Sequence, residues 1–233
     1  MAASSARNSW RSFPWGGINV HPSLLPKYRG ASPIQEAILR RDSVSGICVQ
    51  TIAPEMDTGN ILAKKEIILD GTETTETLSA RVAEDAAALL IETLGRIAEA
   101  GAVPEGSPQE GEASYCSLIE KDSGLIDWNM DAKEICARIR AYTPWPLAYT
   151  VHRGETLYIL EASPCKGPAP EAAESGRWAG TILCMDKKNG ILVQTGGGLL
   201  ALRRLQYRAR KALPWQAFLN GARDFIGAQL GTP

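Results

Sequence analysis

The sequence predicts an α/β protein in which an α/β unit is followed by a β-rich, basic unit. In the first half, short strand patterns alternate with helical ones, and the longest helical pattern places Leu78, Val82 and Leu89 on one face. In the second half, five short strand patterns are separated by glycine-rich turns, which is typical of a small β-barrel. A length of 233 residues is sufficient for two modest domains.

Strand and helix signals alternate through the first unit. A short strand over 18–21 ends at Pro22, and a loop follows over 26–30. Ser32 is a good N-cap and Pro33 a good first helical residue. The expected elements after the loop are a helix over 33–41, strands over 46–53 and 61–69, and a helix over 77–100 that stops at Gly101.

The second unit follows a segment rich in Pro, Gly, Glu and Ser over 103–112, which indicates a linker. Asp131 and Glu134 resemble a capping box that opens a helix ending near Arg140, before a Pro-Trp-Pro run. The expected strands cover 149–152, 156–161, 180–185, 191–195 and 199–205, and a last helix covers 214–225. With the family resemblance given below, the expected domains are 1–14 (leader), 15–102, 103–119 (linker) and 120–233.

Composition excludes several classes of protein. Hydrophobic residues make up 44% of the chain and charged residues 22%, as in ordinary globular proteins. No apolar run approaches the roughly 20 residues that cross a bilayer. The five cysteines are scattered and form no Cys-x-x-Cys pair, so neither a zinc site nor a disulfide framework is indicated. We therefore expect no metal and no membrane insertion.

Charge divides the chain unevenly. Residues 1–119 carry 10 basic and 15 acidic side chains, whereas residues 120–233 carry 15 and 11. The basic second half suggests a polyanionic partner. Residues 1–14 hold four serines, three alanines, two arginines and no acid. This leader resembles a short organellar presequence, and equally an arbitrary stretch created by a misplaced start codon.

The candidate chemistry lies in an Asn-x-His pair near the amino terminus. Asn19 and His21 are two residues apart on a strand and therefore point to the same face. An amide and an imidazolium both donate hydrogen bonds and suit an oxygen that gains negative charge. Asp57 follows in a Met-Asp-Thr-Gly turn and could orient the histidine. A buried structural histidine beside an ordinary turn is the other interpretation of these residues; for His152 we expect that structural role.

A longer run of residues resembles the folate-dependent formyltransferases. The first unit matches in Asn19-Val20-His21-Pro22-Ser23-Leu24-Leu25-Pro26-Lys27-Tyr28-Arg29-Gly30 and in Met56-Asp57-Thr58-Gly59-Asn60-Ile61-Leu62. The second unit resembles the carboxyl-terminal domain of the methionyl-tRNA formyltransferase family in Ile126-Asp127-Trp128 and Ile139-Arg140-Ala141-Tyr142-Thr143-Pro144-Trp145-Pro146. The resemblance extends roughly from Pro14 to Phe225.

This resemblance implies a partial Rossmann-like formyltransferase domain followed by an OB-like barrel. The implied reaction moves a formyl group from 10-formyltetrahydrofolate to the amino group of methionyl-initiator tRNA in translation initiation. Asn19 and His21 would polarise the formyl oxygen, and Asp57 would keep His21 charged and help remove the amine proton. The folate would be bordered by Ser23, Leu24, Leu25 and Pro26.

The resemblance also implies that tRNA phosphates contact the basic tail. The residues concerned are Arg203, Arg204, Arg208, Arg210 and Lys211. Such contacts fix position and make binding depend on salt rather than read sequence. A merely solvated basic face is the other interpretation. We expect Trp128 and Trp145 to be core aromatics rather than base-stacking platforms. The protein is expected to be a cytoplasmic monomer, or organellar if residues 1–14 belong to a presequence.

The sequence departs from the family pattern at its start. About the first ninety to one hundred residues of that pattern, which carry several central strands and part of the folate pocket, have no counterpart here. A parallel strand needs neighbours on both edges and helices on both faces. We therefore expect the chain alone to be inactive or poorly folded unless an amino-terminal fragment complements it. A truncated gene model or a decayed copy would be consistent with this.

The same residues are compatible with three other functions. An amino-sugar-nucleotide formyltransferase or a formyl-folate hydrolase would share the Asn-x-His and Asp set. In a non-catalytic RNA-binding remnant, only the carboxyl-terminal barrel would remain functional. The basic residues from 203 to 211 favour tRNA over a sugar nucleotide, to which they would contribute little.

Overall fold

The computed structural model describes residues 13, 15–165, 178–222 and 224–231. The chain divides into two compact units, residues 1–119 and 120–233. Of the expected leader over 1–14, all but Phe13 lies outside the described residues.

The first unit is built on a three-stranded sheet in the order β1-β3-β4. Its strands are β1 (Ile18–His21), β3 (Val44–Thr51) and β4 (Ile61–Ile68), and both pairings are antiparallel. The middle strand forms the core, because Ile47, Cys48 and Val49 are fully buried. Among the described residues β1 pairs only with β3, and that pairing is antiparallel.

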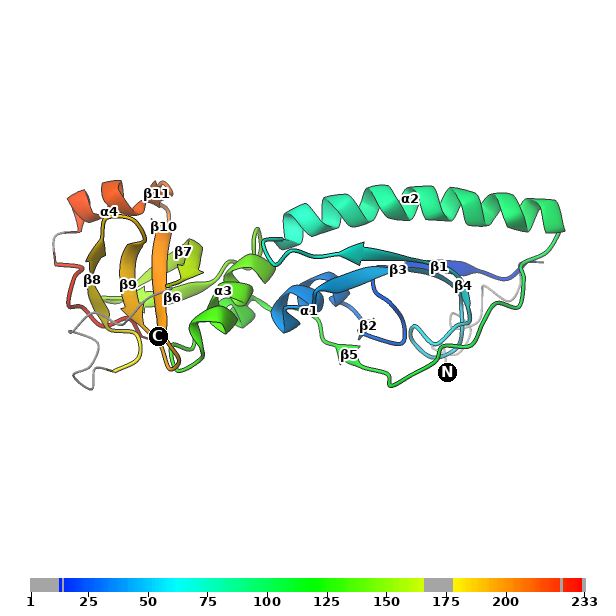
Figure 1. Cartoon of the computed structure of the whole chain (residues 1–233), viewed down its shortest axis with the longest axis horizontal. Coiled ribbons are helices and arrows are strands. Elements are labelled where there is room, and N and C mark those ends of the chain that lie inside the picture. The colour runs from blue at the N-terminus through cyan, green and yellow to red at the C-terminus, as the bar shows by residue number, and fades with distance from the viewer. Residues whose placement is uncertain (1–12, 14, 166–177, 223, 232–233) are drawn as a thin grey trace, which may run out of the picture. The chain divides into compact units, whose positions relative to one another are not determined.

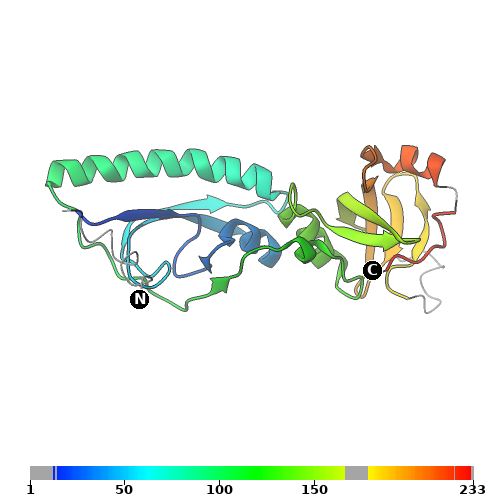
Figure 2. The same cartoon turned by 180° about the vertical axis from the view of Figure 1, so that it is seen from behind.

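One face of this sheet is covered by the long helix α2 (Thr75–Ala100), as Figures 1 and 2 show. The helix begins two residues before its expected start because the Thr74 side chain accepts from the Thr77 backbone N–H. Gly101 ends it in the left-handed conformation, as expected. Leu78, Val82 and Leu89 are buried, as the periodicity predicts.

β2 (Arg29–Gly30) and β5 (Tyr115–Cys116) lie on the side of the sheet away from α2 (Figure 1), whereas α1 (Pro33–Arg40) contacts α2. β2 and β5 pair in parallel. The structure assigns the segment 103–119, expected to be a linker, to the first compact unit. Its backbone adds β5 to the unit, and its Gln109 reaches the candidate site described below.

The second unit holds an antiparallel sheet in the order β6-β7-β10-β9-β8, with β11 paired to β10. Within the described residues no pairing joins β6 to β8, so the sheet forms a half-barrel rather than a closed barrel. Its strands are β6 (Tyr149–His152), β7 (Glu155–Pro164), β8 (Ile182–Asp186), β9 (Gly190–Gln194), β10 (Leu199–Tyr207) and β11 (Leu213–Pro214). Its helices are η2 (Lys121–Gly124), α3 (Ala132–Ala141) and α4 (Trp215–Gly221).

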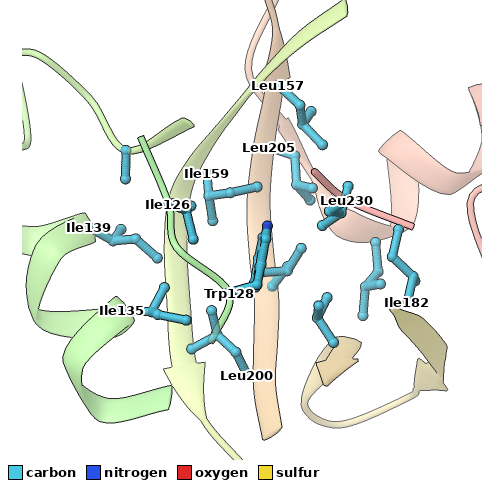
Figure 3. Close-up of a cluster of buried hydrophobic side chains, with 14 of the residues drawn as sticks. Ile126, Trp128, Ile135, Ile139, Leu157, Ile159, Ile182, Leu200, Leu205 and Leu230 are labelled. Atoms are coloured by element: carbon cyan, nitrogen blue, oxygen red, sulfur yellow. The ribbon is translucent and has the colours of Figure 1, made fainter. Parts of the chain in front are cut away.

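The second unit is built around an apolar core, shown in Figure 3. Trp128 lies in it with 4% of its surface exposed, and its indole N–H donates to Thr150 Oγ1 at 3.1 Å. The expectation of a core role is therefore confirmed for Trp128. It is wrong for Trp145, which is 57% exposed because it follows the end of α3 in a proline-flanked turn that leaves the core.

The described residues contain no helix that is both long and apolar enough to cross a membrane.

Candidate active site

The register between β1 and β3 brings the candidate residues together. Asn19 lies opposite Gln50, and His21 lies opposite Cys48. Side chains of directly opposed residues project from the same face of a sheet, and so do residues i and i+2. Asn19, His21 and Gln50 therefore share one face of the first unit. Among the described residues, none accepts from or donates to the Asn19 side chain, which leaves its amide available to a ligand.

His21 is held between two oxygen acceptors. Its Nε2 lies 2.9 Å from the backbone carbonyl of Tyr28, and its Nδ1 lies 3.5 Å from Asp57 Oδ1. The residue is only 4% exposed. A neutral imidazole can donate from one nitrogen alone, whereas an imidazolium donates from both. Each ring nitrogen therefore faces an oxygen, Nε2 a backbone carbonyl and Nδ1 a carboxylate.

Asp57 is fixed by its own hydrogen bonds. Its Oδ2 accepts from the Gly30 backbone N–H at 2.8 Å, and its Oδ1 accepts from Gln50 Nε2 at 3.1 Å. Its φ of 55° places it in the left-handed region, which Asp tolerates better than most residues. The turn at Asp57, identified from sequence as ordinary turn chemistry, therefore also aims a carboxylate at His21.

Gln109 is a site residue that sequence reasoning missed. Its Nε2 donates to the carbonyls of Asp57 and Gly59 at 2.8 and 2.9 Å, and its Oε1 accepts from Arg29 Nη2 at 2.7 Å. Gln109 therefore ties three backbone segments together around the carboxylate. No local pattern could have revealed it, because its neighbours have the composition of a linker.

The loop between β1 and β2 is anchored at Tyr28. Its hydroxyl donates to Asp42 Oδ2 at 2.7 Å, and Lys27 Nζ reaches the same oxygen at 3.0 Å. Burial and the nearby Asp42 carboxylate raise the pKa of Tyr28 well above its usual range. The phenol therefore stays protonated and holds the Tyr28 carbonyl in place against His21.

The four residues expected to border the folate follow His21 directly. Ser23 and Pro26 are buried, and the Ser23 hydroxyl donates to the carbonyl of Lys27. Leu24 and Leu25 are partly buried, and Leu24 packs so closely on Gly46 that a Cβ there would overlap Leu24 Cδ2. The loop that carries these residues begins at His21 and packs on β3 through Leu24. Their contact with folate stays a prediction.

All five basic residues expected to contact tRNA are exposed on the second unit: Arg203, Arg204, Arg208, Arg210 and Lys211. An irregularity in the β7–β10 ladder lies between Leu202 and Leu205, both fully buried. It turns Arg203 and Arg204 outward together, which regular alternation would not allow. Two of the five have acidic neighbours: Arg204 lies 3.5 Å from Glu161, and Arg210 lies 3.6 Å from Glu155.

His152 lies in the second unit and takes no part in this group. Its Nδ1 lies 2.6 Å from the Tyr207 hydroxyl, and its ring meets Phe225 edge to face. It is 6% exposed, and burial lowers its pKa. These contacts are consistent with the expected structural role, which stays a prediction; the Nε2 of His152 is buried and has no hydrogen-bond partner among the described residues. The described residues contain no group of three or more His, Cys, Asp or Glu side chains that could hold a metal ion.

Comparisons with known proteins agree with this two-unit arrangement. Residues 9–94 match the family "Formyl transferase", and residues 118–223 match "Formyl transferase, C-terminal domain". A curated methionyl-tRNA formyltransferase from Treponema denticola is 46% identical over 92% of this chain and 66% of its own length. The corresponding protein from Treponema pallidum is 41% identical over 94% of this chain and 67% of its own length.

Two solved structures have a similar fold. Methionyl-tRNA formyltransferase from Clostridium thermocellum is 25% identical with a TM-score of 0.52, covering 65% of this chain and 64% of its own. HypX from Aquifex aeolicus, solved with tetrahydrofolic acid, is 17% identical with a TM-score of 0.61, covering 90% of this chain and 36% of its own.

The fold and the matched domains define a formyl transferase. The chain belongs to the methionyl-tRNA formyltransferase family. It spans about two thirds of the length of the curated relatives that it matches.

Proposed function

We propose that this chain carries the catalytic residues and the tRNA-binding unit of a methionyl-tRNA formyltransferase. The reaction is transfer of a formyl group from 10-formyltetrahydrofolate to the amino group of methionine on initiator tRNA. The observation that carries the proposal is the convergence of Asn19, His21 and Asp57 on one face of the first unit in a chain 46% identical to a curated member of the family.

The site supplies groups for each stage of this transfer. The neutral amine attacks the formyl carbon, and the carbonyl oxygen gains a negative charge. The Asn19 amide and the His21 imidazolium can donate hydrogen bonds to that oxygen; one such donor is typically worth roughly 10²–10³ in rate. Asp57 can accept the proton that the amine loses. The bond between the formyl carbon and the folate nitrogen then breaks, and that nitrogen takes up a proton.

His21 must exchange one contact to take part. In the structure its Nε2 faces the Tyr28 carbonyl, 2.9 Å away, and its Nδ1 faces Asp57. We infer that the formyl oxygen competes with the Tyr28 carbonyl for the Nε2 proton while Asp57 continues to hold Nδ1. Hydrogen bonds of a catalytic group often tighten only in the substrate complex.

The tRNA would contact the second unit through Arg203, Arg204, Arg208, Arg210 and Lys211. Their exposure leaves them free to reach phosphates, and the ion pairs of Arg204 and Arg210 with acidic neighbours are exposed and weak. Each phosphate contact should contribute about 0.7–0.9 to the slope of log affinity against log salt.

The test is a formylation assay with 10-formyltetrahydrofolate and methionyl-initiator tRNA. The chain is assayed alone and with the part of the T. denticola relative that lies outside the match. We expect formyl-methionyl-tRNA to form in the supplemented reaction and to fall roughly 10²–10³-fold in the Asn19→Ala chain. Absence of product in every reaction, with a folded chain, would refute the proposal. Product that persists in Asn19→Ala and His21→Ala chains would refute the assigned site.

A further inference from the structure

A cavity of about 370 Å³ opens on the second unit, away from the buried core. Such a volume falls within the range of small-ligand sites. Its lining combines two aromatic rings, two cations and one carboxylate: Tyr149, Tyr158, Lys121, Arg208 and Asp122. Of these, only Arg208 belongs to the basic set already considered.

Strand alternation places the two tyrosines on the outward face of the half-barrel. Tyr149 on β6 lies opposite Tyr158 on β7. The residues that flank Tyr158, Leu157 and Ile159, are fully buried in the core, so Tyr158 points the other way. The two rings meet edge to face, with centroids 6.4 Å apart. Both are only partly buried, which leaves aromatic surface for a planar ligand.

Local contacts fix the rim of this cavity. Burial, together with the charge of the nearby Asp122 carboxylate, raises the pKa of Tyr149. The Arg208 backbone N–H donates to the Thr156 carbonyl at 3.0 Å, which holds Arg208 at the end of the strand that carries Tyr158. Lys121 lies beside Asp122 in η2. The cavity lining thus combines two aromatic rings with two cationic side chains.

We propose that this cavity takes one unstacked nucleotide of an RNA strand, with the base stacked on Tyr158 and a phosphate beside Lys121 and Arg208. Aromatic rings in a basic groove are how proteins hold single-stranded nucleic acid. Continuity of charge favours RNA as the occupant, since Arg208 also belongs to the exposed basic run that begins at Arg203 on β10. The inference deepens the proposed function, because tRNA is the RNA that the proposed function requires.

The test measures binding of a short, labelled single-stranded oligoribonucleotide to the full chain by fluorescence anisotropy at several salt concentrations. Tyr158→Ala should weaken binding roughly tenfold without changing the salt slope, because stacking releases no counterions. Tyr158→Phe should restore affinity. Lys121→Ala should reduce the slope by close to one. The matched controls, Trp178→Ala and Lys188→Ala, alter an exposed aromatic and an exposed lysine elsewhere on the same unit and should leave binding unchanged.

Two outcomes would overturn the inference. One is equal affinity of the Tyr158→Ala and Trp178→Ala chains for the oligoribonucleotide. The other is a loss in Tyr158→Ala that Tyr158→Phe fails to restore although both variants unfold at the parent's temperature. The proposed function is judged separately by formylation. If product forms but Tyr158 has no role in binding, the nucleotide site fails and the proposed function stands. If the Tyr158 substitution weakens binding and no product forms, the nucleotide site stands and the proposed function fails.

Discussion

The side chains of His21 and Asp57 face each other within the first unit, with His21 Nδ1 and Asp57 Oδ1 3.5 Å apart. Their side chains are only 5% and 12% exposed, so the pair is shielded from water. The other imidazole nitrogen is 2.9 Å from the Tyr28 carbonyl. A ring with an acceptor at each nitrogen keeps its orientation, and this fixes the direction in which it can donate to a substrate.

Neutralising Asp57 should reduce catalysis far more than it reduces stability. Asp57→Asn keeps the side-chain shape but removes the charge opposite His21 and the proton acceptor. We expect formyl transfer in the supplemented assay to fall by roughly 10²–10⁴. Glu55→Gln is the matched control, because Glu55 is an exposed carboxylate two residues away. Similar rates for the two variants would show that Asp57 has no role in the transfer.

Removing the Gln109 side chain should loosen the first unit. Gln109→Ala leaves the carbonyls of Asp57 and Gly59 without their donor. Unsatisfied, partly buried polar groups cost about 1–3 kcal/mol, so we expect a loss of that size in the free energy of unfolding, measured in urea. Glu110→Ala, at the exposed neighbouring position, should change it by less than about 0.5 kcal/mol. A Gln109→Ala chain as stable as Glu110→Ala would indicate that the segment 103–119 contributes nothing to the unit.

Two glycines should respond in opposite ways to alanine. A Cβ at Gly59 would clash with the Thr51 carbonyl oxygen, so the backbone beside Asp57 would have to move. We expect Gly59→Ala to cost about 3 kcal/mol of stability. Gly95 lies in α2 with open space where a Cβ would stand, so Gly95→Ala should stabilise the chain by about 0.5–1 kcal/mol. Thermal unfolding of both variants provides the check; stabilisation by Gly59→Ala would contradict the geometry of that turn.

The stability of the second unit should fall in mild acid because of His152. Burial lowers the pKa of His152 below its ordinary value of 6.5, so in acid the unfolded chain binds a proton that the folded chain resists. The stabilisation is therefore complete above about pH 6.5 and is lost as the pH falls from there towards the lowered pKa. Unfolding in urea between pH 8 and pH 5 should show this slope, and His152→Gln should flatten it. An unchanged slope in His152→Gln would assign the effect to other groups.

Local sequence rules located most elements because they depend on neighbours in the chain. The periodicity of Leu78, Val82 and Leu89 and the stop at Gly101 identified α2. The Asp131 capping box identified α3, whose cap residue accepts from the Lys133 N–H. Weak elements were missed: β2 and β5 are two residues each and exist only because they pair with each other across more than eighty positions. The expected last helix over 214–225 ends earlier, at Gly221.

The amino-acid sequence was sufficient to predict the two-unit α/β organisation and the family resemblance, and to single out Asn19, His21 and Asp57 as candidate catalytic residues. These rest on residue order, periodicity and motif spacing, which are properties of the chain alone. How these three side chains come together follows from contacts between segments that are distant in the chain. The folded chain places Gln50 opposite Asn19 and hydrogen-bonds the Gln109 side chain to the Asp57 carbonyl. It also turns Tyr149 and Tyr158 to the same outward face of the second unit. Strand register and contacts between distant segments are set by packing of the whole unit, and no local pattern records them.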